Sequence, residues 1–229
     1  MNRLTIAIPT FRRPQDLKRA VIGVLEQAGE LVGGSSAEAR EPEGDAAGAA
    51  DVDGVAGRGV SDVEVLVIDN DAQGTGREAA LAAAADAGVP VRSSAEAPEE
   101  PGDVSLRYVV EERPGVAAVR NRALDETGGR DLLVFIDDDE IPSPGWLKAL
   151  VSTWRAQGCA AVTGPTPPTF EVDPSAWVTA SGAFDSWEAA DGAQVRSADT
   201  GNLLLDLAVV ENLGLRFDPR YGLTGGEDS

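Results

Sequence analysis

The chain has 229 residues, a formal net charge of −20 at pH 7 and 42% hydrophobic residues. This charge argues against a nucleic-acid backbone or an anionic membrane surface as a partner, because both are negative themselves. It does not exclude a nucleotide, whose phosphates a cation can neutralise locally. Histidine is absent, so a general base would be a carboxylate or, failing that, a Lys, Tyr or Cys.

The sequence also indicates a cellular compartment. A single cysteine, Cys159, excludes an internal disulfide framework and fits a reducing environment. The N-terminus does not resemble a signal peptide, and no apolar run approaches the ~20 residues of a membrane span. We therefore expect a cytoplasmic protein, which a partner could hold at a membrane.

Predicted strands and helices alternate along the chain. Apolar runs predict strands at 4–8, 63–68, 106–110, 132–136 and 159–163. Helical stripes predict helices that begin at Pro14 and Pro144 and others over 76–87 and 116–126. Further on, 200–205 is predicted as a strand and 206–213 as a short helix. Such alternation predicts an α/β fold with a mostly parallel sheet flanked by helices.

Two segments interrupt the alternation. Residues 29–61 and 90–103 are rich in small and acidic residues and have hardly any large apolar side chain. We predict that both are low-complexity acidic insertions on the surface.

A cluster of acids follows the most apolar strand. Residues 132–136 read as a strand buried on both faces, and Asp137, Asp138, Asp139 and Glu140 come directly after it. Clustered carboxylates repel one another unless a cation lies among them, and oxygen ligands suit Mg2+ or Mn2+. A solvated acidic turn is the alternative in so acidic a chain.

Polar loops follow three of the predicted strands, at residues 10–13, 69–71 and 137–140. In a parallel sheet these loops lie at one edge, where such folds bind their ligands. The sequence therefore predicts one binding site at this edge.

Five motifs occur in order along nearly the whole chain: Ile8-Pro-Thr-Phe-Arg12, Val67-Ile-Asp-Asn70, Arg120-Asn121, Phe135-Ile-Asp-Asp-Asp-Glu140 and Gly225-Gly-Glu-Asp228. Together they resemble the family 2 glycosyltransferases. The resemblance implies a GT-A fold with a Rossmann-like sheet, formed here as a single domain over 1–229. Residues 1–140 would be the nucleotide-binding half and 141–229 the acceptor half. The chain ends one residue after Asp228, whereas the family continues past this motif, so we expect a truncated acceptor half.

The resemblance also implies the donor site. Asp139 would hold the metal, Mg2+ or Mn2+, on the donor diphosphate, with a register among the three aspartates that is open by one residue. The nucleotide-sugar would contact Pro9, Thr10, Phe11, Arg12, Asp69, Arg120, Asp137 and Asp138. Phe11 would stack on the base and Asp69 would accept a hydrogen bond from it. A core-packed Phe11, a plain turn at 69–71 and a structural ion pair of Arg120 are the alternatives.

On the acceptor side, an inverting enzyme needs a carboxylate base across the sugar from the leaving group. Asp228 is the implied base, and Glu227 would orient it or bind the acceptor beside Gly226. Trp177 and Trp187, with Phe184 between them, fit an acceptor groove as well as ordinary core packing. Gly201 and Asn202 could form the floor under the donor sugar.

The expected function is metal-dependent transfer of a sugar from a nucleotide donor to a hydroxyl acceptor, with inversion. UDP-sugars are favoured as donors, with dTDP and GDP open, and the acceptor is a glycan, a lipid-linked glycan or a small molecule. Three alternatives remain: a nucleotide-sugar-binding module without turnover, an acidic structural domain, and a sugar-nucleotidyltransferase. The last would need a glycine-rich triphosphate loop after the first strand, and residues 10–13 contain no glycine.

Overall fold

The computed structural model describes residues 1–38, 59–93, 103–170, 172–182, 184 and 189–220. The strands in this part of the chain are β1 (Asn2–Thr10), β2 (Val60–Asp69), β3 (Val91–Arg92), β4 (Val104–Val110), β5 (Leu132–Phe135), β6 (Ala161–Thr163) and β7 (Leu203–Asp206). The helices are α1 (Pro14–Glu38), α2 (Arg77–Asp86), α3 (Val116–Glu126), α4 (Trp146–Gln157), α5 (Ala176–Ser181) and α6 (Leu207–Leu213), with a 3-10 turn, η1, at Thr200–Asn202.

These strands form one mixed sheet in the order β3-β4-β2-β1-β5-β7-β6. The pairs β3–β4, β4–β2, β2–β1 and β1–β5 are parallel. Strand β7 is antiparallel to both β5 and β6, so it is reversed relative to the described strands around it. The predicted α/β class with a mostly parallel sheet is therefore confirmed.

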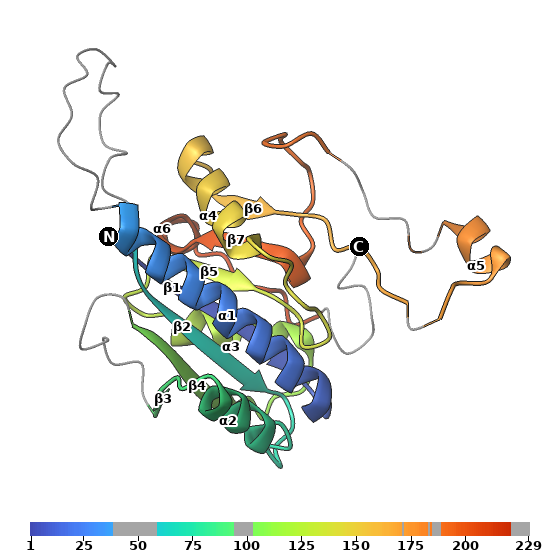
Figure 1. Ribbon diagram of the computed structural model, residues 1–229, viewed down its shortest axis with the longest axis horizontal. Helices are drawn as coiled ribbons and strands as arrows, with labels where there is room; N and C mark the ends of the chain where they lie inside the picture. Colours follow the sequence, from blue (N-terminus) through green and yellow to red (C-terminus); the bar gives the residue numbers. More distant parts are fainter. Residues whose placement is uncertain (39–58, 94–102, 171, 183, 185–188, 221–229) are drawn as a thin grey trace.

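Helices cover both faces of the sheet (Figure 1). One apolar cluster joins α1, α2 and α4 to the sheet, and a second joins α3 and α6 to its other face. Strand β2 shows why both are needed: Val63, Val65 and Val67 belong to the first cluster, whereas Leu66 and Ile68 belong to the second. Side chains alternate along a strand, so an apolar run of this kind requires cover on both faces.

Helix α1 is longer than the sequence predicted. The predicted apolar stripe is buried, and the helix then continues through Gly29 to Glu38, into the segment predicted as an insertion. Ala28 and Val32 are the reason, because they extend the stripe at helical spacing and are buried against the sheet. Strand β3 likewise lies inside the second predicted insertion. The first predicted insertion also overlaps the start of β2 at Val60, and residues 39–58 and 94–102 lie outside the described residues.

Charged side chains are buried beneath α3, which the sequence analysis did not predict. Arg107 of β4 donates to both carboxylate oxygens of Glu64 of β2, at 3.0 and 3.1 Å, and also pairs with Glu126 of α3. Arg130 pairs with Asp62 and lies 3.7 Å from Glu64. These residues replace apolar contacts on the α3 face of β2, near its amino end.

Helix α5 lies apart from the layered body, on a chain segment that extends away from it (Figure 1). Within the described residues, no helix combines the length and apolarity that crossing a bilayer requires.

Candidate active site

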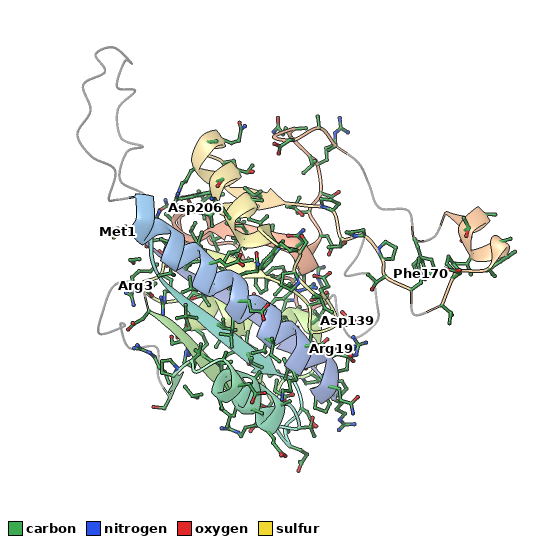
Figure 2. All side chains as sticks on the ribbon, viewed as in Figure 1. Met1, Arg3, Arg19, Asp139, Phe170 and Asp206 are labelled. Carbon is green, nitrogen blue, oxygen red and sulfur yellow. The ribbon has the colours of Figure 1, made fainter. Side chains whose placement is uncertain are left out.

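Hydrogen bonds connect the loops that follow β1, β2 and β5 at one edge of the sheet. The backbone N–H of Asn70 donates to the carbonyl of Thr10 at 2.9 Å, and the Thr10 hydroxyl donates to Asp138 at 2.6 Å. Asp139 lies at the opposite end of the sheet from Arg3, near the start of β1 (Figure 2). The predicted convergence of the three loops at the carboxyl edge is therefore confirmed.

Asp138 is the fixed member of the acidic cluster. Its side chain is buried, and it accepts hydrogen bonds from the Thr10 hydroxyl and the Phe11 backbone N–H. Burial raises the pKa of Asp138, while the Thr10 hydrogen bond and the Arg13 guanidinium, 3.5 Å away, oppose that rise. The loop after β1 thus holds this carboxylate in one orientation.

Asp139 is the open member of the cluster. Its side chain is 54% exposed, and one carboxylate oxygen lies 2.5 Å from Nη1 of Arg13. The negative charges of Asp138 and Asp139 raise the pKa of Arg13 above its ordinary value. The sequence analysis named the loop 10–13 but did not include Arg13 among the site residues. Its position in that loop, four residues after Pro9, was the signal that could have found it.

Asp137 and Glu140 form a second, half-buried acidic pair. Burial raises the pKa of Asp137 to about 6, which the nearby charge of Arg120 opposes. Burial, reinforced by the charge of Asp137, raises the pKa of Glu140 to about 8. A Cβ at Gly201 would overlap the Glu140 carboxylate, so any larger residue there would require that carboxylate to move.

The donor atoms at this edge fit a hard divalent cation. Asp138 and Asp139 offer carboxylate oxygens, the ligand type such ions prefer, and the Arg13 guanidinium already supplies a positive charge beside them. In the described part of the chain, no three acidic or thiol side chains converge closely enough to enclose an ion. Asp139 and its neighbours could therefore supply one or two of the ligands of Mg2+ or Mn2+, which commonly keeps waters and binds substrate phosphates as well.

Phe11, the predicted stacking residue for the base, projects from the loop after β1. The residue is 52% exposed, so the alternative that it packs into the core is wrong. Arg12 adopts a left-handed backbone conformation, φ 57°, and its guanidinium lies 4.9 Å from the centre of the Phe11 ring. Pro9 belongs to β1 and pairs with Ile68, which places it at the same edge.

Asp69 shapes the loop after β2 from inside the protein. It has no exposed surface and accepts hydrogen bonds from the backbone N–H groups of Asp71 and Gly76, each at 2.8 Å. The Tyr108 hydroxyl also donates to it. Because the side chain is fully buried and holds the backbone of residues 71–76, the geometry favours the alternative of a turn-forming Asp69.

Asn70 connects the same loop to the start of α3. Its amide donates to the carbonyls of Glu111 and Arg113, at 2.8 and 2.7 Å, and accepts from the Gly115 N–H at 3.0 Å. Every amide atom is therefore engaged in holding two loops at fixed spacing.

Arg120 lies on α3, buried, where its charge acts on Asp137 and its guanidinium is 5.8 Å from the centre of the Phe217 ring. The neighbouring Asn121 donates to the Phe217 carbonyl at 2.7 Å and accepts from its N–H at 2.9 Å. These contacts hold the segment after α6 against α3.

The predicted acceptor residues are only partly described. Trp177, on α5, is 79% exposed and Phe184 is 54% exposed, so the core-packing alternative is wrong for both. Asn202, which follows Gly201 in the chain, is buried. Its side-chain oxygen accepts a hydrogen bond from the Trp146 indole N–H at 2.9 Å. Trp187, Gly226, Glu227 and Asp228 lie outside the described residues.

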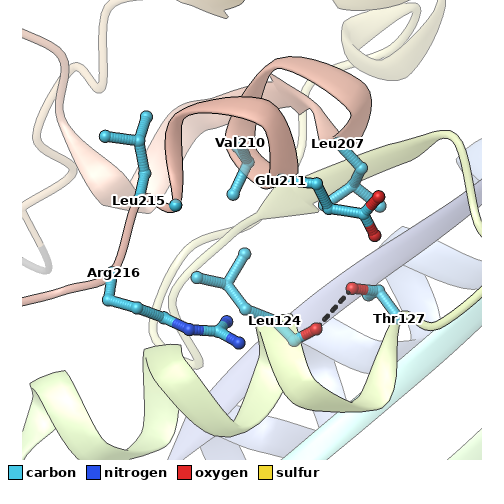
Figure 3. Close-up of a pocket in the computed structure, with 8 residues that line it drawn as sticks. Leu124, Thr127, Leu207, Val210, Glu211, Leu215 and Arg216 are labelled. Atoms are coloured by element: carbon cyan, nitrogen blue, oxygen red, sulfur yellow. Dashed lines mark hydrogen bonds between the residues drawn. The ribbon is translucent and has the colours of Figure 1, made fainter.

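A hollow of about 260 Å³ lies elsewhere, between α3 and α6 (Figure 3). Its lining comprises Leu124, Thr127, Leu207, Val210, Glu211, Gly214, Leu215 and Arg216. Leu207 begins α6 at the end of the reversed strand β7, so this hollow is at the amino edge of the parallel strands. It is therefore separate from the predicted site.

Comparison with known proteins places the chain in a family. The pattern described as "Glycosyl transferase family 2" matches residues 52–190. The succinoglycan biosynthesis protein ExoM of Rhizobium meliloti (strain 1021) is 38% identical over 136 residues, which are 58% of this chain and 42% of that protein. The chain thus spans less than half the length of this relative.

Solved structures agree in fold. A mannosyltransferase from Pyrobaculum calidifontis, PcManGT, in complex with GDP-Man and Mn2+, has a TM-score of 0.55 at 17% identity, over 93% of this chain and 47% of that one. TarS of S. aureus (residues 1–349) has a TM-score of 0.54 at 11% identity, over 94% and 50%. With the family pattern and the sheet order, these similarities lead to one conclusion: the chain belongs to glycosyl transferase family 2 and has the GT-A fold.

Proposed function

We propose that this enzyme transfers a sugar from a nucleoside-diphosphate donor to a hydroxyl acceptor, with inversion and with a divalent cation at Asp139. One observation supports this proposal above the others. At the carboxyl edge of a family 2 sheet, the loop after β1 fixes Asp138 through Thr10 and leaves Asp139 open to solvent. A carboxylate held in one orientation beside an exposed one suits a donor whose ribose and diphosphate are bound by different carboxylates.

The donor would lie along the loop 9–13. The exposed ring of Phe11 offers a face to the nucleobase, and such stacking contributes ~1–3 kcal/mol. Pro9, Thr10 and Arg12 would line the base and ribose, and Asp137 or Asp138 would accept from ribose hydroxyls. The structural neighbours support a nucleoside diphosphate, since PcManGT is in complex with GDP-Man and TarS with UDP-GlcNAc, the latter at TM-score 0.50.

Asp139 would be the metal ligand, with Asp137 close behind it. When bound, the cation acts as a Lewis acid that offsets the charge developing on the departing diphosphate. Arg120 would contribute a positive field beneath the acidic cluster, since its charge already acts on Asp137. We do not propose Asp69 as a direct base contact, because its oxygens are used inside the protein.

The acceptor would approach from the side of the C-terminal half. Asp228 would take the proton of the attacking hydroxyl as its oxygen bonds the anomeric carbon, while the diphosphate leaves from the opposite face. Glu227 and Gly226 would position that acceptor, and Trp177 and Trp187 would pack on its sugar rings. The relative named for succinoglycan biosynthesis supports a saccharide polymer or its lipid-linked precursor as acceptor.

Titration calorimetry tests the donor site directly. UDP, GDP and dTDP are titrated with and without Mn2+ into wild type, Asp139→Ala and a control, Asp86→Ala. Asp86 is an exposed carboxylate that pairs with Lys18 on α1, so its loss changes net charge equally. We expect one nucleotide to bind only with Mn2+, roughly tenfold or more weaker in Asp139→Ala and unchanged in the control.

Absence of binding for every nucleotide, in a folded sample, would contradict the proposal. Metal-dependent binding without turnover of the matching nucleotide-sugar in any acceptor mixture would instead favour the binding module.

A further inference from the structure

Arg13 places a positive charge beside the two aspartates Asp138 and Asp139. Its Nη1 is 2.5 Å from Asp139 and 3.5 Å from Asp138, whereas Asp138 has other partners in Thr10 and the Phe11 N–H. Asp138 would therefore keep its position if Arg13 moved away. The Asp139 side chain is more than half exposed, and its ion pair with Arg13 restrains it.

The two adjacent arginines point to different loops. Arg12 pairs with Asp71 at 3.4 Å after β2, and Arg13 pairs with Asp139 after β5. The left-handed backbone at Arg12, φ 57°, separates their directions, and non-glycine residues adopt it infrequently. The backbone of this loop therefore directs Arg13, and not Arg12, toward the acidic cluster.

The Arg13 side chain is 53% exposed, which leaves it room to reorient. Its guanidinium contacts one buried carboxylate, Asp138, and one exposed carboxylate, Asp139. A guanidinium stays charged at any physiological pH, and its fork of N–H donors matches phosphate oxygens as well as carboxylates. A divalent cation arriving at Asp139 would repel it, and a diphosphate beside that cation would attract it.

We infer that Arg13 is a positioning residue that occupies the cation's place at Asp139 before metal binds and turns to the donor diphosphate once the metal is there. This inference rests on the proposed function. It makes the ion pair a competitor of the metal when no nucleotide is present, and an aid to nucleotide binding when the metal is bound. Metal and nucleotide then bind with positive coupling, because each removes an obstacle to the other.

The inference predicts opposite changes in two affinities of Arg13→Gln. The affinity for Mn2+ alone, read from the free Mn2+ signal in electron paramagnetic resonance, should rise about fivefold, as expected for loss of an exposed ion pair. The affinity for the metal-dependent nucleotide at saturating Mn2+ should fall about fivefold or more. Arg13→Lys keeps a charge without the fork, so its Mn2+ affinity should stay near wild type while nucleotide affinity falls.

Arg19→Gln is the matched control. Arg19 lies on α1, six residues after Arg13; it is 65% exposed and pairs with Asp16 instead of the acidic cluster. Its loss removes the same charge, and Mn2+ affinity should stay within about twofold of wild type.

An unchanged or weaker affinity of Arg13→Gln for Mn2+ alone would overturn the inference, as would a rise matched by Arg19→Gln. A simple structural role of Arg13 would lower both affinities together. The Mn2+ titration contains no nucleotide, so it also separates the two proposals: failure of nucleotide binding in wild type counts against the proposed function, whatever Arg13→Gln does to the metal.

Discussion

Replacing Arg107 by methionine should destabilise the fold more than removal of an ordinary surface ion pair. Arg107 is 2% exposed and makes two hydrogen bonds to Glu64, itself 1% exposed, as well as pairing with Glu126. Breaking a buried pair from one side costs ~3–5 kcal/mol, because the other charge stays buried. Arg130, 3.7 Å from Glu64, compensates in part, so we expect about 3 kcal/mol.

Urea unfolding followed by circular dichroism measures this loss. For a chain of this size about 3 kcal/mol corresponds to a fall of roughly 6–12 °C in Tm, and the urea midpoint should drop with an unchanged m-value. Arg216→Met is the control, because its pair with Asp125 is more than half exposed on both sides and should contribute less than about 1 kcal/mol.

A second variant tests the cause. The double variant Arg107→Met, Glu64→Gln removes the stranded charge and should recover part of the stability lost by Arg107→Met alone, a coupling of about 1 kcal/mol or more. A loss below about 1 kcal/mol for Arg107→Met, or a double variant whose losses simply add, would refute the reasoning.

Three other predictions each concern the replacement of a single residue. Thr10→Val should lower the free energy of unfolding by about 1.5–3 kcal/mol, because Asp138 loses a hydrogen bond, and Thr10→Ser should retain most of it; urea midpoints compare the two. Gly29→Ala should raise stability by ~0.5–1 kcal/mol, because Gly29 is inside α1 with open space around it; destabilisation would argue for the loop that the sequence suggested. The Arg113 guanidinium lowers the pKa of Glu111, so that pair stabilises the fold above the ordinary value near 4.5 and loses its effect as pH falls below it. The gap in urea midpoint between wild type and Glu111→Gln should therefore narrow from pH 6 to pH 3.5, and a constant gap would contradict this assignment.

Periodicity predicted the elements well, because it reports which face of an element is buried. The helix after Pro14, the strand before Asp137 and the helix over 116–126 follow directly from apolar spacing. The same signal explains the meeting of three loops at one edge, since parallel strands bring their carboxyl ends together. It could not predict the reversal of β7, because strand direction depends on the path of a long connection.

Contacts between residues far apart in the chain could not be predicted from the sequence. Glu64 and Arg107 are 43 positions apart, and an alternating pattern gives no sign that two charges inside strands will meet. Asp69 shows the related limit at the site, since an acid at a strand end has the same sequence signal whether it faces a ligand or closes a turn. The contact between Arg13 and Asp139 depends on the left-handed backbone of Arg12. The residue types in this loop give no sign of that conformation.

The reversed strand β7 determines how the later part of the chain joins the site. Because β7 is antiparallel to β5, with Leu203 opposite Phe135, its first residue lies where β5 ends. Gly201, just before it, is therefore brought against Glu140 by strand pairing alone. The connection between β6 and β7 can then change in length and sequence without displacing this contact. The fold thus fixes the acidic edge through the sheet, independently of the segment that carries α5.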